Sequence, residues 1–294
     1  MNLRISRMTA IGAASVAAVL LLGGVALAAA PPAPHFNGFE NVGDVNGPTD
    51  DTMDNVTRVT SGTNGILSAD GAHHAIAGLA DYPHAAYLFT RYGGYSSVFP
   101  DGGYTTSADI YLDMAESQID EDSRFDWSSA INGTDGNHQR DFIFSVGTDG
   151  AGGFVMSASN NAPGWPANPG RDPLTITTTG WYTFQHVFYD DGGVLAVDMS
   201  VLDSDSLVLN TWTLSYWADT IDGLAGEVGG NRYGWLVTND FDGLPIDNVF
   251  RSGVLPSPVI ADDCKKHGWE TVFRADETAF VNQGVCIQYV LTGK

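Results

Sequence analysis

One stretch decides the fold of this chain: the strand GWYTFQHVF (residues 180–188), the turn YDDGG (189–193) and the strand VLAVDMSV (194–201). Aspartate and glycine between two alternating runs are a strong local signal for a β-hairpin. Alternation puts Gln185 and His186 on opposite faces of the first strand, so one of them is expected to face the core and be hydrogen-bonded. We expect Trp181 to lie in the core as well.

Further stretches of the same kind run along the chain in both directions. In residues 105–112, Ala108, Ile110 and Leu112 alternate with polar positions, and residues 141–147 and 153–158 flank a second Asp-Gly turn. About a dozen short strands with regularly spaced turns, and no convincing amphipathic helix, predict an all-β fold: an antiparallel β-sandwich of the jelly-roll type.

The N-terminus is typical of an export signal. Arg4 and Arg7 precede an apolar run that ends in the small residues Ala26-Leu27-Ala28, and a proline-rich spacer follows. We therefore expect a secreted, extracellular protein with no stable membrane span after signal cleavage; a retained N-terminal anchor is the alternative. The expected organisation is a signal peptide (1–28), a spacer (29–35), the β-sandwich (36–251), a linker (252–263) and a C-terminal tail module (264–294).

Composition and cysteine usage narrow the possible partners. The chain has 294 residues and a formal net charge of −22, which excludes nucleic acid binding through a basic face. The two cysteines, Cys264 and Cys286, allow one pairing, and an exported chain predicts that they form a disulfide. A small disulfide-closed satellite is therefore expected at the C-terminus.

The order of strands and loops, with Trp181-Tyr182-Thr183-Phe184 before the central hairpin, resembles concanavalin A-like (laminin G-like) jelly rolls. Such folds include carbohydrate-binding modules, lectin-like domains, glycoside hydrolases and polysaccharide lyases. In many of the carbohydrate-binding modules, a glutamate in an opening Gly-Phe-Glu and an aspartate in a closing Ile-Asp-Asn-Val hold a structural calcium. Residues 38–40 and 246–249 fit these segments, so the resemblance implies Glu40 and Asp247 as calcium ligands.

A second resemblance covers the C-terminal tail. CKKHGW (264–269) and FVNQGVCIQYV (280–290) are similar to a Cys-Lys-x-Gly-Gly-Trp … Asn-Gln-Gly-x-Cys tail of exported proteins from high-GC Gram-positive bacteria. His267 stands where that tail usually has glycine. The resemblance implies a bacterial, exported protein and supports the disulfide.

Sugar binding uses flat aromatic faces together with amides and charged groups that bond to hydroxyls. Three clusters have that mixture, and they supply the predicted ligand residues: Asn137, His138, Arg140, Trp165, Asn231, Arg232 and Tyr233. The alternative is structural, with Arg140, Asp141 and Arg232 in buried ion pairs.

The sequence favours an exported, calcium-stabilised domain that binds a glycan or another extracellular polymer without cleaving it. A jelly-roll hydrolase is disfavoured, because no strand carries the alternating acids Glu-x-Asp-x-x-Glu. A polysaccharide lyase is the alternative enzyme, with active groups from Gln185-His186, Arg140 or Arg232, and Tyr233. A structural or adhesive cell-surface protein is the third hypothesis.

Overall fold

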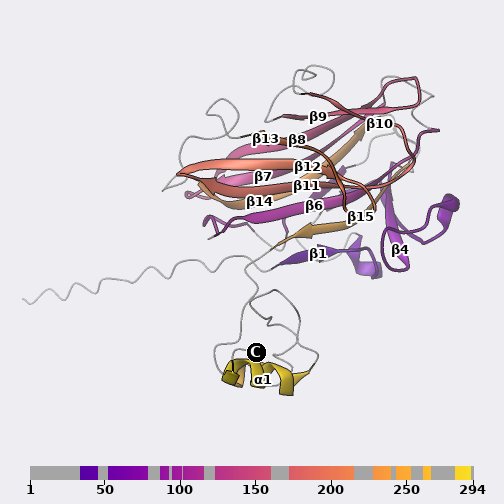
Figure 1. Cartoon of the computed structure of the whole chain (residues 1–294). Coiled ribbons are helices and arrows are strands. Elements are labelled where there is room, and N and C mark those ends of the chain that lie inside the picture. The colour runs from indigo at the N-terminus through magenta and orange to yellow at the C-terminus, as the bar shows by residue number, and fades with distance from the viewer. Residues whose placement is uncertain are drawn as a thin grey trace, which may run out of the picture.

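The computed structural model describes residues 34–45, 52–78, 87–92, 95–100, 102–115, 123–159, 172–214, 228–239, 243–252, 261–265 and 282–292. The expected signal peptide, most of the spacer and Trp165 lie outside these residues. Nearly all of the described elements are strands, which form two antiparallel sheets that pack face to face (Figure 1). The predicted all-β sandwich is confirmed.

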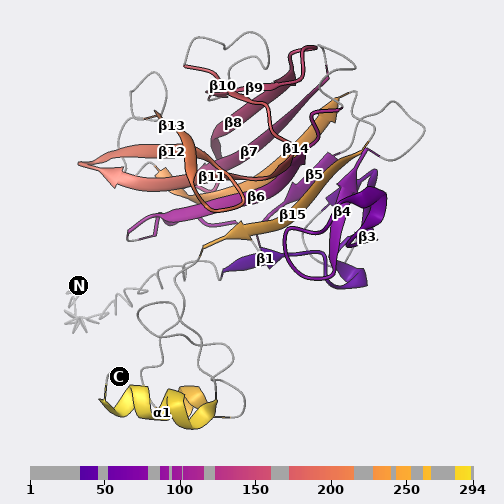
Figure 2. The same ribbon diagram turned by 45° about the vertical axis from the view of Figure 1, so that its right-hand side comes forward.

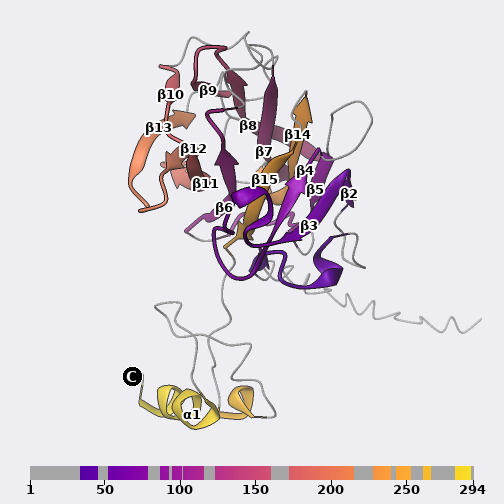
Figure 3. The ribbon, with the colours of Figure 1, turned by 90° about the vertical axis from the view of Figure 1, so that its right-hand side faces the viewer.

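We call the two layers sheet A and sheet B, and Figure 3 shows them from the side. Sheet A has the strand order β13 (Val208–Leu214), β12 (Val194–Leu202), β11 (Gly180–Asp191), β6 (Tyr104–Leu112), β15 (Leu244–Arg251), β4 (His73–Ala77) and β3 (Val56–Thr60), with β1 (His35–Asn37) also paired to β15. Sheet B has the order β10 (Leu174–Ile176), β9 (Phe154–Ser159), β8 (His138–Thr148), β7 (Arg124–Gly133), β14 (Val228–Asn239), β5 (Tyr87–Thr90) and β2 (Thr52–Asp54).

The hairpin of β11 and β12 forms as the sequence predicts. Asp191 pairs with Val194 across a two-residue turn, and both turn glycines have positive φ, 68° at Gly192 and 98° at Gly193. Two positive φ angles in succession favour glycine and match the twist of the flanking strands. The Asp190 carboxylate closes the turn by accepting the Gly193 amide at 2.6 Å.

Aromatic side chains fill the space between the sheets. The ring of Phe184 on β11 meets the rings of Phe125 and Phe144 on sheet B edge to face, at 5.8 Å and 5.3 Å. His186 lies in the same layer, fully buried, with its Nε2 at 3.0 Å from the Phe142 carbonyl. Of Gln185 and His186, the histidine is therefore the core residue, and it is hydrogen-bonded as expected.

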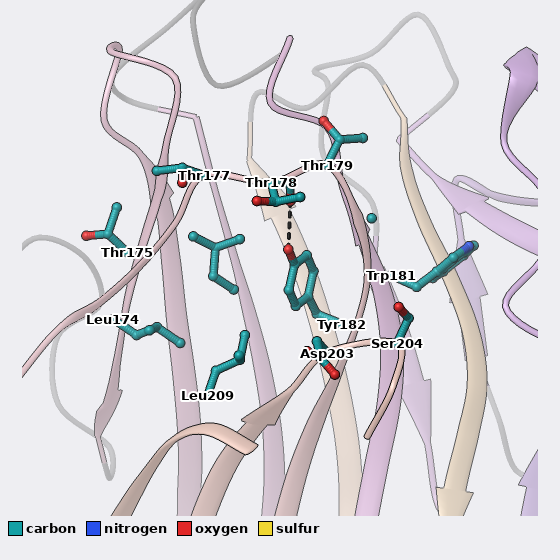
Figure 4. A pocket seen from close by; sticks show the side chains of 12 residues that line it. Leu174, Thr175, Thr177, Thr178, Thr179, Trp181, Tyr182, Asp203, Ser204 and Leu209 are labelled. Carbon is teal, nitrogen blue, oxygen red and sulfur yellow. Dashed lines mark hydrogen bonds between the residues drawn. The ribbon is translucent and has the colours of Figure 1, made fainter. Parts of the chain in front are cut away.

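The prediction that Trp181 is a core residue was wrong. Trp181 precedes the fully alternating part of β11 and points to the opposite side from the buried Tyr182, as Figure 4 shows. On the outer face of sheet A its ring packs against Tyr111, and its indole N–H donates to the Leu67 carbonyl at 2.8 Å. The loop around Leu67 thus covers part of the ring, which no strand pattern reveals.

The C-terminal disulfide is present. Cys264, at the end of the 3-10 helix η4 (Ala261–Cys264), is bonded to Cys286 in the helix α1 (Gln283–Thr292), which is the yellow end of the chain in Figure 2. The sequence did not predict this helix. Its start is marked by Asn282, whose side chain accepts the Val285 amide at 3.0 Å as a helix cap does. No helix among the described residues is long and apolar enough to cross a membrane.

Candidate functional site

Register shifts in two strand pairings shape one end of sheet B, where β8 and β14 begin and β5 ends. The register shifts between β7 and β8 at Ile131 and Asn132, and between β7 and β14 on both sides of Asn231. An extra residue in one strand changes the face to which the next side chain points, and such bulges are frequent beside functional sites. Here they leave His138, Asp141 and Tyr233 on the same outer face of the sheet, next to Arg232.

Five side chains at this end form a closed circuit of alternating contacts, which we call the aromatic–arginine ring: Phe89, Arg91, Tyr95, Arg232 and Tyr233. The Arg91 guanidinium lies 6.0 Å from the ring centroid of Phe89 and 5.3 Å from that of Tyr95. The Arg232 guanidinium lies 4.9 Å from Tyr95 and 5.5 Å from Tyr233. Phe89 and Tyr233 close the circuit at 4.7 Å. Cation–π contacts at such distances hold the flat faces of both arginines.

The segment that carries Tyr95 is held against β14 by backbone hydrogen bonds. The Ser96 amide donates to the Asn231 carbonyl at 2.9 Å, and the Gly230 amide donates to the Ser96 carbonyl at 3.1 Å. The approach is close enough to require glycine, because a Cβ added at Gly230 would lie 2.6 Å from both Ser96 Oγ and the Val98 carbonyl. Gly230 therefore allows the segment with Tyr95 to pack against β14, which positions Tyr95 beside Arg232.

A histidine, an aspartate and a tryptophan adjoin the ring. The His138 imidazole lies parallel to Tyr233 at 6.1 Å, and its Nε2 is 2.9 Å from Asp141 Oδ2. The other oxygen of Asp141 accepts the indole N–H of Trp235 at 3.2 Å. Asp141 is thus engaged through both oxygens, and the arrangement fixes the orientation of His138.

The described partners of Arg232 are all neutral groups. Its Nη1 donates to Asn132 Oδ1 at 2.8 Å and to the Gly136 carbonyl at 3.1 Å. Its remaining contacts are the rings of Tyr95 and Tyr233, and no carboxylate of the described residues pairs with it. The structural alternative, with Arg140, Asp141 and Arg232 in buried ion pairs, finds no ion pair at Arg232 among the described residues, and Asp141 binds His138 and Trp235.

The predicted ligand residues have different fates. His138, Arg232 and Tyr233 come together at the ring. Asn137 lies in the exposed turn before β8, where its backbone and side-chain N–H groups donate to Asp135 and lower the pKa of that carboxyl. Asn231 is fully buried, and its carbonyl holds the segment of Ser96.

Arg140 and Trp165 do not join the ring in what the structure describes. Arg140 pairs in register with Ile131, one position from Asp141, so it alternates to the other side of β8. Trp165 lies outside the described residues. Three members of the aromatic–arginine ring, Phe89, Arg91 and Tyr95, were not predicted. The alternation in β5 indicates the face on which Phe89 lies. No pattern in the sequence indicates that Tyr95 lies between two arginines.

Glu40 and Asp247 both bind the loop before β4. Glu40 Oε1 accepts the amides of Ala72 and His73 at 2.8 and 3.0 Å. Asp247 Oδ2 accepts the amides of Ala69 and Asp70 at 3.1 and 3.4 Å. The two carboxylates are therefore linked through one short loop, as the ends of an antiparallel sandwich allow.

Asp247 also forms a pair of like charges. It lies opposite Asp109 in the register of β15 and β6 and is completely buried. Burial, and in smaller part the charge of Asp109, raise the pKa of Asp247 to about 7. Asp109 is held by Thr183 Oγ1 and Asn248 Nδ2, and burial raises its pKa as well. Among the described residues, no group of three or more His, Cys, Asp or Glu side chains could hold a metal.

A cavity of about 440 Å³ lies at the edge of the sandwich, between the β10–β11 connection and the turn that joins β12 to β13 (Figure 4). Leu174, Leu209 and Tyr182 line it, and the Tyr182 hydroxyl donates to the Thr178 carbonyl at 2.7 Å. Its size lies in the range of small-molecule sites. Its lining is apolar and hydroxyl-rich, with Asp203 as its only charged side chain among those described.

The chain resembles several solved β-sandwiches. The CBM2 module of the evolved Dit of Lactobacillus casei BL23 phage J-1 is 10% identical, covers 76% of this chain and 96% of its own, and has a TM-score of 0.34. The conserved carbohydrate esterase of the Shiga toxin-encoding bacteriophage phi24B is 12% identical over 74% and 97%, with a TM-score of 0.39. Lectin II from Ulex europaeus is 8% identical over 69% and 97%, with a TM-score of 0.32.

No protein-family model matches the sequence, and a search of curated proteins finds no match. At these TM-scores the structural similarities carry no functional conclusion for this chain.

Proposed function

We propose that this chain is an exported, non-catalytic domain that binds a glycan at the aromatic–arginine ring. The observation that carries the proposal is the position of Tyr95, which is 44% exposed and in contact with the guanidinium groups of both Arg91 and Arg232. An exposed tyrosine fixed in this way offers apolar surface that a sugar ring can cover. The neighbouring guanidinium and imidazole groups supply hydrogen bonds to hydroxyls.

Several features favour binding over catalysis. His186, one of the histidines considered for a lyase, is buried in the core, where desolvation lowers its pKa to about 3. It therefore has no path to a substrate. Asp141, the carboxylate beside the ring, is engaged by His138 and Trp235. A hydrolase needs two carboxyl groups that face one sugar bond, and the ring supplies no such pair.

A lyase at the ring remains the second proposal, because His138, Tyr233 and Arg232 are adjacent. A lyase needs a base beside a group that neutralises the sugar carboxylate, and these residue types meet that need. Incubation with uronic acid polymers separates the two proposals. Ultraviolet absorbance of an unsaturated product would establish a lyase, whereas binding without such a product is the result expected for a binding domain.

Calcium is proposed as a structural ion at Asp247, with Glu40 as the second carboxylate at the same loop. The buried carboxylate of Asp247 and the partly buried carboxylate of Asp109 lie on neighbouring strands and repel each other, and a proton or a cation removes that cost. Ca²⁺ takes carboxylate and carbonyl oxygens in flexible geometry. The second oxygens also have protein partners, because Glu40 Oε2 lies 3.2 Å from His73 Nδ1 and Asp247 Oδ1 accepts the Asn248 amide at 2.9 Å. An ion would therefore share these two oxygens with the protein.

Export is proposed on the leader-like N-terminus and on the disulfide between Cys264 and Cys286, since disulfides persist in oxidising compartments. A glycan array with the mature protein tests the binding proposal. We expect binding to at least one glycan, lost in Tyr95→Ala and in Tyr233→Ala. The control is Phe36→Ala, which removes a phenylalanine side chain on β1 that is 62% exposed and is not part of the aromatic–arginine ring. This variant should bind normally. If no glycan binds, a structural or adhesive role becomes the better account.

A further inference from the structure

We propose that the glycan bound at the aromatic–arginine ring is anionic, and that its carboxylate or sulfate ester pairs with Arg232. This inference rests on the proposed function and adds the chemical class of the ligand. The described protein partners of Arg232 leave its positive charge uncompensated.

Arg232 is half-buried, and its hydrogen bonds go to the Asn132 amide oxygen and the Gly136 carbonyl. Its Nε is buried and has no acceptor among the described residues. The rings of Tyr95 and Tyr233 hold the flat face of the guanidinium, but an aromatic quadrupole does not neutralise a full charge. Half-buried cations are ordinarily paired, because desolvation is costly.

Arg232 has no carboxylate partner among the described residues, although the formal net charge of the protein is −22. Two described acids of β8 and of the turn before it have other partners: Asp141 binds His138 and Trp235, and Asp135 binds Asn137. The guanidinium of Arg58, by contrast, donates to the backbone carbonyls of Phe39 and Glu40, as a structural arginine does. Arg232 is thus positioned by neutral groups, and its charge is left for a ligand.

The ring also brings Arg91 to the same tyrosine, so two guanidinium groups border the surface that a sugar would cover. A planar guanidinium matches a carboxylate or a sulfate through paired N–H donors. In a partly desolvated site, such a pair discriminates strongly against a neutral analogue. Neutral glycans lack the group that would satisfy Arg232.

Two pairs of polymers test the inference, because each pair keeps the sugar and changes only its charge. The first is polygalacturonate and its methyl ester; the second is a sulfated galactan and its desulfated form. Affinities of the mature protein are measured by isothermal titration calorimetry at two salt concentrations. We expect the acidic member of one pair to bind at least ~10-fold tighter than its neutral partner, with weaker binding at higher salt. The pair that shows the preference distinguishes carboxylate from sulfate.

Matched variants connect the preference to one residue. Arg232→Gln is expected to abolish the preference, and Arg232→Lys to retain part of it. Arg58→Gln removes the same charge on sheet A and should leave the preference intact, provided that its melting temperature shows a folded protein. Equal or tighter binding of the neutral member, or an unchanged preference in Arg232→Gln, would overturn the inference while glycan binding stands. Binding to no member of either pair and to no glycan on the array would overturn both.

Discussion

The guanidinium of Arg232 lies 4.9 Å from the ring centroid of Tyr95, although the two residues are far apart in the sequence and Tyr95 belongs to no strand. The contact depends on the backbone pairing of Ser96 with Gly230 and Asn231, which brings the segment after β5 against the irregular start of β14. Binding by the aromatic–arginine ring therefore depends on a close approach of two backbones.

Gly230→Ala should weaken both stability and glycan binding. The new Cβ would lie 2.6 Å from Ser96 Oγ and from the Val98 carbonyl, so the segment of Tyr95 must move away from β14. Overpacking of this kind costs about 1–3 kcal/mol. Urea unfolding measures the change. The control is Gly180→Ala, where a Cβ meets nothing within 4 Å, and it should be neutral. Equal stability of the two variants would show that the close approach is not needed.

Asp247 should make the metal-free protein less stable as the pH rises. Its folded pKa of about 7 is above that of an unfolded aspartate, about 3.9, so the folded state holds the proton more tightly. The stabilisation is complete below the unfolded pKa and is lost as the pH rises through the folded pKa. The measurement is the free energy of unfolding against pH in wild type and Asp247→Asn, with calcium removed. The decline between about pH 4 and about pH 7 should be smaller in the variant; parallel curves would refute the assignment.

Calcium should reverse that loss at neutral pH. An ion that binds only the folded state stabilises it by an amount that grows with the logarithm of its concentration, so the melting temperature should rise with added Ca²⁺ and fall with a chelator. Asp247→Asn and Glu40→Gln should reduce the rise. A wild-type melting temperature that does not respond to calcium would remove the structural ion from the proposal and leave the proton as the group that relieves the repulsion.

His186 should stay neutral throughout the physiological range. Burial lowers its pKa to about 3, and its Nε2 faces the Phe142 carbonyl. In NMR spectra recorded between about pH 5 and about pH 8, where ordinary histidines titrate, the His186 ring signals should not shift. A titration in this range would mean that water reaches the ring, and it would restore His186 as a possible catalytic base.

Reduction of the disulfide should leave the sandwich folded. Among the described residues, Cys264 and Cys286 form a buried cluster with partly buried residues of α1, separate from the core cluster between the sheets. Removing a cross-link of this loop size costs roughly 3 kcal/mol in the chain-entropy model. The loss of stability should therefore appear as a smaller helical signal in circular dichroism. The melting temperature of the main thermal transition, which reports on the sandwich, should not change. A shift of the main transition on reduction would show that the C-terminal element supports the sandwich.

The architecture could be predicted because its determinants are local. The Gly192-Gly193 turn and the alternation of Tyr182, Phe184, His186 and Phe188 suffice to define β11, β12 and the face of β11 that is buried. Helix α1 was missed because it is short and lies in a tail that was interpreted through its cysteines. Trp181 was wrongly predicted to lie in the core, because the loop around Leu67 that covers part of its ring is remote in the sequence.

The candidate site could be predicted only in part. Arg232 and Tyr233 stand in a conspicuous polar and aromatic stretch, and His138 opens a strand. Their meeting depends on three register shifts, and the membership of Tyr95 depends on a long-range backbone pairing. A shift of one residue in a strand changes which side chains share a face, and alternation alone does not reveal it.

The central claim, that the ring binds a glycan, is tested most directly by calorimetric titration of Tyr95→Ala with the glycan that wild type binds best on the array. Tyr95 contributes its exposed face and holds both arginines in place. Its removal should therefore weaken binding at least ~10-fold, which corresponds to about 1.4 kcal/mol, with an unchanged melting temperature. Wild-type affinity in a folded Tyr95→Ala protein would contradict the account.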